Sequence, residues 1–143
     1  MMTRKLIVAA FLGFIWSLSA SAQDLQISHA WIRLLPEQLP AAGYFKLLNH
    51  SGHVFVLVGV SSPDYARAMM HQSMTMNGME EMLPLKTIII PAHGQISFAP
   101  DGDHLMLEGA KKTLKPGETV PITLHFSGGR ELVTRFIVKG PAG

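Results

Sequence analysis

The chain has 143 residues, of which 48% are hydrophobic and 15% charged, enough for one folded domain with its own core. The formal net charge is +2, and Arg4 and Lys5 in the N-terminal segment account for that excess, which argues against a nucleic-acid surface. There is no cysteine, so thiolate nucleophiles, cysteine-ligated zinc and cysteine-ligated blue copper are excluded.

The N-terminal residues have the features of an export signal. Arg4 and Lys5 precede the apolar run LIVAAFLGFIW, and Ala20-Ser21-Ala22 forms an A-x-A cleavage site. The run is short for a membrane span, and no second apolar stretch of spanning length follows. We therefore expect a secretory signal peptide over residues 1–22 and a mature domain over residues 23–143, with a retained anchor as the alternative.

The mature chain alternates short apolar, β-rich runs with turn residues about every ten positions. The runs are LQISHAWIRL, GYFKLLN, HVFVLVGV, the stretch around 71–86, TIII, QISFA, HLMLEG, TVPITLHF and ELVTRFIV. This spacing predicts one all-β domain, an antiparallel sandwich or barrel. In the first run, His29 shares a strand face with Ile27 and Trp31, so we expect a partly buried structural histidine.

The stretch MMHQSMTMNGMEEM, residues 69–82, holds six of the nine methionines in the chain. Asn77-Gly78 within it is a strong hairpin signal, because both positions of a type I′ turn need positive φ. A turn there pairs Ser73 with Met82 and Met76 with Met79. His71 then has Met82 as its diagonal neighbour on one face.

The other methionines of the stretch divide between the two faces of the hairpin. Met74, Met76 and Met79 fall on the face opposite His71, as packing, a hydrophobic rim or a secondary surface. Met69 has the parity of His71 and could approach it, whereas Met70 belongs to the other face.

A second His/Met pair lies in DGDHLMLEG. In a strand, His104 and Met106 project from the same face roughly 7 Å apart. Leu105 and Leu107 take the opposite face, which is the natural core side.

Two interpretations of these pairs stay open. Methionine fills irregular cores and adaptable surfaces well, so the residues could serve only for packing or docking. Histidine with thioether is also a soft, neutral ligand set that suits Cu(I) better than Mg²⁺, Ca²⁺ or Zn²⁺.

The remaining histidines and serines do not indicate an enzyme. In TVPITLHF, His125 points away from the apolar face and is expected in solvent, and His50, His53 and His93 lie at turns. The sequence has no G-x-S-x-G elbow or paired-carboxylate motif, so a hydrolase is not expected.

The spacing of the two pairs resembles a known signature. His71, ten residues, Met82, twenty-one residues, His104, one residue and Met106 is similar to the H-x10-M-x21-H-x-M pattern of the PCu(A)C-type periplasmic copper chaperones. The flanking blocks are similar as well, and they extend over nearly the whole mature chain. They are AWIR, AAGYFKLLN, LVGVSSP, MHQSM, NGM and IPAHGQISFAPDGDHLMLEGAKKTLKPGETVPITLHF.

The resemblance implies a cupredoxin-like antiparallel β-sandwich in the periplasm that binds Cu(I) through His71, Met82, His104 and Met106. It also implies delivery to a copper-receiving protein, such as the Cu(A) site of cytochrome c oxidase or another copper chaperone. We expect a monomer without enzymatic activity. Copper buffering or tolerance without a dedicated client is the alternative. Gln72 stands where the family often has an acidic residue, and the chain stops at IVKGPAG without a Met- and His-rich tail, so no second, Cu(II)-capable site is expected.

Exposure and stepwise ligand exchange are expected of such a site. The partners that orient its imidazoles are not evident from the sequence, and Asp103 and Glu108 are candidates for His104 because of their proximity along the chain.

Overall fold

The computed structural model describes residues 24–143, so the expected signal peptide and its cleavage point lie outside the described residues. The described chain is almost entirely strand and turn, which confirms the all-β prediction. Its elements are β1 (Leu25–Arg33), the 3-10 turn η1 (Pro36–Gln38), β2 (Ala41–Asn49), β3 (Phe55–Ser61), β4 (Tyr65–Met76), β5 (Met79–Leu85), β6 (Ile88–Ile90), β7 (Gln95–Phe98), β8 (Asp103–Ala110), β9 (Thr119–Phe126) and β10 (Glu131–Lys139). Within residues 24–143, no helix has the length and apolar character needed to cross a membrane.

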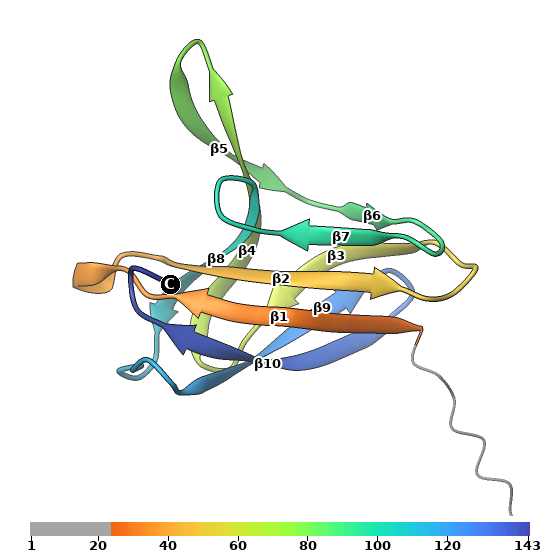
Figure 1. Cartoon of the computed structure of the whole chain (residues 1–143). Coiled ribbons are helices and arrows are strands. Elements are labelled where there is room, and N and C mark those ends of the chain that lie inside the picture. The colour runs from red at the N-terminus through yellow and green to blue at the C-terminus, as the bar shows by residue number, and fades with distance from the viewer. Residues whose placement is uncertain (1–23) are drawn as a thin grey trace, which may run out of the picture.

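The strands form one continuous hydrogen-bonded ladder in the order β5-β4-β8-β2-β1-β10-β9-β3-β6, and β7 also pairs with β2. The ladder curls back on itself, so that β2 and β7 lie in one layer and β9 and β10 in the other (Figure 1). The pairing of β1 with β10 is parallel, whereas the other pairings are antiparallel as predicted.

Alternating side chains from both layers build the core. In β9 the residues Val120, Ile122, Leu124 and Phe126 are all buried on one face, as the alternation in TVPITLHF predicts. Phe45 of β2 contacts Phe136 of β10 across the core, with ring centroids 5.8 Å apart. Each buried side chain of this size contributes about 1.5–3 kcal/mol, so the interior between the layers holds the domain together without disulfides.

His29 is not the partly buried residue that its parity predicts. The β1–β2 register shifts between Ser28 and Trp31, and His29 lies in this bulge with φ of 52°. The extra residue reverses the side-chain alternation, so His29 is exposed. The prediction was wrong because it assumed an unbroken strand.

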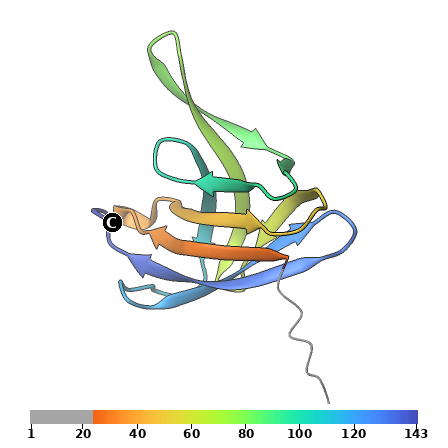
Figure 2. The ribbon, with the colours of Figure 1, turned by 45° about the vertical axis from the view of Figure 1, so that its right-hand side comes forward.

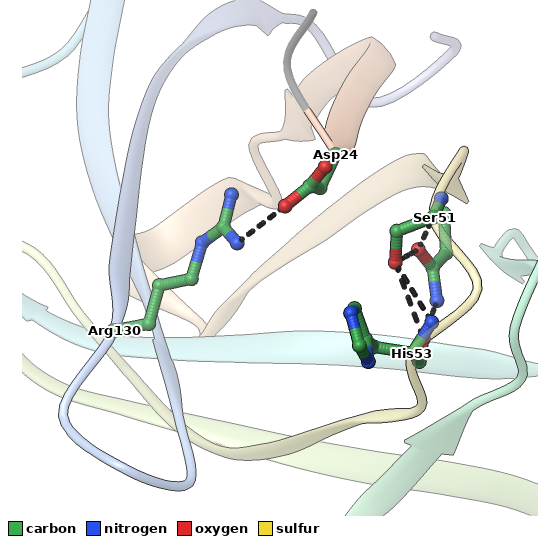
Figure 3. A network of polar contacts seen from close by, with 5 residues as sticks. Asp24, Ser51, His53 and Arg130 are labelled. Carbon is green, nitrogen blue, oxygen red and sulfur yellow. Dashed lines mark hydrogen bonds and ion pairs between the residues drawn. The ribbon is translucent and has the colours of Figure 1, made fainter. Parts of the chain in front are cut away.

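A buried asparagine organises the loop after β2. The Asn49 amide donates to the His53 carbonyl at 2.6 Å, and its oxygen accepts from the Ser51 hydroxyl at 2.8 Å. Figure 3 shows Ser51 and His53 together in this loop, with the ion pair between Arg130 and Asp24 nearby. That pair is 3.3 Å long and exposed, so it contributes about 0–1 kcal/mol, and the buried amide is the stronger constraint.

Candidate metal site

The pairing of β4 with β8 brings the two His/Met groups together. His71 lies directly opposite His104, and Met69 lies directly opposite Met106. Directly opposed residues share a face of the sheet, and so do residues two positions apart, so all four side chains lie on one face. The imidazole centroids are 5.9 Å apart, with the rings inclined at 68°.

The reverse face of the same strands belongs to the core. Leu105 and Leu107 are buried there, and Met70 of β4, opposite Leu105, is only 4% exposed. The apolar side chains fix the orientation of β4 and β8, because a shift of one residue would turn the leucines outward. The His104 and Met106 side chains are therefore held on the outer face, as the strand alternation predicts.

Met82 reaches this face through the β4–β5 hairpin. Asn77 and Gly78 both have positive φ, 52° and 77°, and Ser73 pairs with Met82, which is the register that the turn sequence predicts. Met82 is thus the diagonal neighbour of His71. The hairpin projects from the body of the sheet (Figures 1 and 2), and the Met82 side chain is 59% exposed.

His104 is more deeply buried than an open site would suggest, with 7% of its surface exposed. Its Nδ1 lies 3.1 Å from the carbonyl oxygen of Gly102. A carbonyl only accepts, so Nδ1 donates the proton and Nε2 carries the free lone pair. The partner of His104 is therefore a backbone carbonyl, and the sequence proposal of Asp103 or Glu108 was wrong.

His71 is held in the neutral form by its surroundings. Burial lowers its pKa, and the neighbouring His104 lowers the pKa further, while Glu108 acts weakly in the opposite direction. Its Nδ1 is buried with no hydrogen-bond partner among the described residues. A neutral imidazole with an unused nitrogen is suited to ligate a metal ion.

Met69 is a residue whose position the sequence left open. It is half-buried opposite Met106, which adds a third sulfur near the two imidazoles. A guanidinium nitrogen of Arg67 donates to the Met69 sulfur at 3.6 Å, and Arg67 also pairs with Glu108 at 3.6 Å. The sequence indicated only that Met69 and His71 share a strand face. That Met69 also lies close to Met106 follows from the β4–β8 pairing.

The other histidines of the described chain lie elsewhere. His125 of β9 lies close to two polar side chains, with Nε2 2.7 Å from the Ser61 hydroxyl and Nδ1 3.3 Å from a Glu131 oxygen. The sequence did not predict this Ser-His-Glu row. The side chains of His125 and Glu131 are 35% and 59% exposed, so the row is a solvated contact across three strands.

The potential metal-donor atoms on the outer face are soft or borderline and uncharged. Two imidazoles and up to three thioethers lie on β4, β5 and β8, a donor set that favours a monovalent soft ion over hard divalent ions. Residues 24–143 hold no group of three or more His, Cys, Asp or Glu side chains positioned for a metal.

The chain is similar in sequence to proteins of one family. The sequence model of the LpqE-like family matches residues 25–138. A lipoprotein-like protein of Leifsonia xyli subsp. xyli is 33% identical over 123 residues, which cover 85% of this chain and 74% of that protein.

Several solved structures share the fold. The Cu(I) form of DR1885 from Deinococcus radiodurans is 36% identical with a TM-score of 0.62, covering 86% of this chain and 85% of that one. The copper-bound PCuAC domain of PmoF2 is 24% identical with a TM-score of 0.68, covering 83% of this chain and 95% of that domain. The chain therefore belongs to the LpqE-like family, and the solved structures that share its fold include PCuAC domains, in agreement with the resemblance of its sequence.

Proposed function

We propose that this protein binds one Cu(I) ion through His71, Met82, His104 and Met106 and passes it to a client protein. The observation that carries the proposal is the β4–β8 register, which sets His71 opposite His104 on the face that Met106 shares. The relationship to DR1885, solved with Cu(I), supports the choice of metal.

The donor set explains why binding is reversible. Imidazole and thioether are neutral, so the charge of the ion stays uncompensated by its own ligands. The exposed Met82 is the donor that a partner can replace first, since it lies on the projecting hairpin, whereas the buried His104 is the last. A client offering thiolates can then draw the ion out by stepwise ligand exchange.

Export defines where this exchange takes place. We infer that residues 1–22 are removed and that residues 23–143 act in the periplasm as a monomeric carrier without enzymatic activity. The client proposed is a copper-receiving protein such as the Cu(A) site of cytochrome c oxidase. Ten basic and ten acidic residues would remain after cleavage, which provides no surplus charge for nucleic-acid binding.

A competition titration against a Cu(I) chelator under reducing conditions tests the proposal. We expect one tight equivalent, strong preference over Zn²⁺, and loss of tight binding in His71→Ala. His53→Ala is the matched control, because His53 lies in the Asn49 loop away from the site. Zinc binding as tight as Cu(I) binding, or an unaffected His71→Ala variant, would contradict the assignment.

Copper buffering without a dedicated client is the competing function, and the methionines outside the site favour it. Several weak, equivalent sites and no transfer to an acceptor would identify a buffer. One tight site whose metal moves to a Cu(A)-type acceptor faster than it dissociates into a chelator would identify a chaperone.

A further inference from the structure

Three methionines that the proposed site does not use lie together on the projecting part of the hairpin. Met74, Met76 and Met79 are 38%, 46% and 67% exposed. The end of the β4–β5 hairpin projects away from the rest of the domain in both views (Figures 1 and 2). The three side chains therefore have no packing role comparable to that of the buried Met70.

The register places the three sulfur-bearing side chains at neighbouring positions. Met76 pairs directly with Met79, and Met74 lies two residues further along the same strand, opposite Glu81. Directly opposed Cβ atoms are about 4.5–5.5 Å apart and diagonal positions about 7–8 Å, within reach of long side chains. Three thioethers and one carboxylate thus share one face of the hairpin.

The two faces of the hairpin differ in a way that packing alone does not require. Between the Met74–Glu81 and Met76–Met79 pairs, the opposite face carries Thr75 paired with Glu80. Leucine would form an apolar surface equally well, but residues 74, 76 and 79 are all methionine. Methionine differs from leucine of similar volume by its soft donor atom.

We propose that Met74, Met76 and Met79 form a second, weaker site for a soft monovalent cation, Cu(I) or Ag(I). This site uses no residue of the His71–His104 site and lies on the opposite face of the hairpin. It is the weaker of the two, because it has no imidazole and its ligands must be ordered from an exposed hairpin. Glu81 supplies the negative charge that three neutral sulfurs lack.

An Ag(I) titration in chloride-free buffer, followed by NMR of the methionine methyl groups, tests the proposal. With the first equivalent we expect shifts at Met82 and Met106, and with the second at Met74, Met76 and Met79. The triple change of these three residues to leucine should abolish the second equivalent and keep the first. His71→Ala should weaken the first equivalent and leave the methyl shifts of the hairpin tip intact.

Two controls separate this inference from the proposed function. Met70→Leu alters a buried methionine of the same strand and should leave both equivalents unchanged, whereas Glu81→Gln should weaken only the second. Methyl groups of Met74, Met76 and Met79 that do not move at several equivalents, or a second equivalent that survives the triple change, would overturn the tip site. Either result leaves the first equivalent, and hence the proposed function, to be judged by His71→Ala.

Discussion

At the scale of single residues, the two histidines of the site differ in the surroundings of their Nδ1 atoms. Nδ1 of His104 donates to the Gly102 carbonyl, which fixes the tautomer and the ring orientation. Nδ1 of His71 is buried without a partner among the described residues, a situation that costs about 1–3 kcal/mol. One imidazole is therefore oriented by the backbone, and the other gains most from binding an ion or a water molecule.

The choice between Met82 and Met69 as a sulfur ligand can be tested by leucine substitution. We expect Met82→Leu and Met106→Leu to weaken Cu(I) binding sharply, because leucine conserves volume but has no donor atom. The free energy of unfolding of the metal-free protein should change by less than about 1.5 kcal/mol. Met69→Leu should keep most of the affinity, since its sulfur already accepts from Arg67. Chelator competition measures each case, and the reverse ranking of Met69 and Met82 would identify Met69 as the ligand.

Tyr65 provides a pH-dependent test of the core. Its hydroxyl is buried with no hydrogen-bond partner in residues 24–143, and burial, with a smaller effect of Asp64, raises its pKa from 10.0 to about 12. Well below pH 10 the Tyr65 hydroxyl is protonated in both the folded and the unfolded chain. As the pH rises from 10 towards 12, the unfolded chain releases the proton while the folded chain retains it, so the folded state loses stability.

Tyr65→Phe should therefore lose less stability than the wild type between pH 7 and pH 11, and at pH 7 it should be at least as stable. Urea unfolding at the two pH values measures the difference. Since the pKa of Tyr44 is also raised by burial, part of the alkaline loss should persist in the variant. An identical loss in both proteins would show that folding does not raise the pKa of Tyr65.

At the scale of the elements, the sequence predicted what depends on local pattern. The Asn77-Gly78 turn fixes the β4–β5 register, and the alternation in β8 separates His104 and Met106 from the buried leucines. The His71 to His104 pairing depends on a contact between distant strands, which periodicity does not specify. In the sequence, only the resemblance to a known family places the two histidines in one site.

Three local features could not be predicted from the sequence, each for a physical reason. The bulge at His29 inserts a residue without a glycine or proline to mark it, so the parity argument failed there. The proximity of Met69 to Met106 follows only from the β4–β8 register. The hydrogen bond from His104 to Gly102 depends on how the loop before β8 folds back.

The hairpin turn can be perturbed with a matched control. Gly78 and Gly128 have φ of +77° and +87°, and a Cβ at either position would meet no atom of the described chain within 4 Å. Each alanine variant should therefore lose about 1–2 kcal/mol through backbone conformation alone. Gly78→Ala should also weaken Cu(I) binding, because the turn positions Met82, whereas Gly128→Ala in the β9–β10 turn should not. Equal Cu(I) affinities in the two variants would show that Met82 does not depend on the turn.

At the scale of the whole molecule, the site exists only in the folded chain. Its proposed donors come from β4, β5 and β8. The apolar side chains on the reverse face of β4 and β8 are packed in the hydrophobic core, which holds these two strands in place. An unfolded chain would offer the same histidines and methionines without their geometry. Metal binding at the proposed site would therefore be coupled to folding.

This coupling predicts that Cu(I) raises the melting temperature of the protein. A ligand that binds only the folded state adds about 2.7 kcal/mol when its free concentration is about 100 times Kd. His71→Ala should lose most of this gain, because it removes a ligand from a half-buried position, and His53→Ala should retain it. The triple leucine variant of Met74, Met76 and Met79 should also retain it, since the tight site stays intact. Thermal unfolding with and without Cu(I) under reducing conditions measures all four proteins. A gain that persists in His71→Ala but disappears in the triple variant would place the tight site at the hairpin tip and refute the His71–His104 assignment.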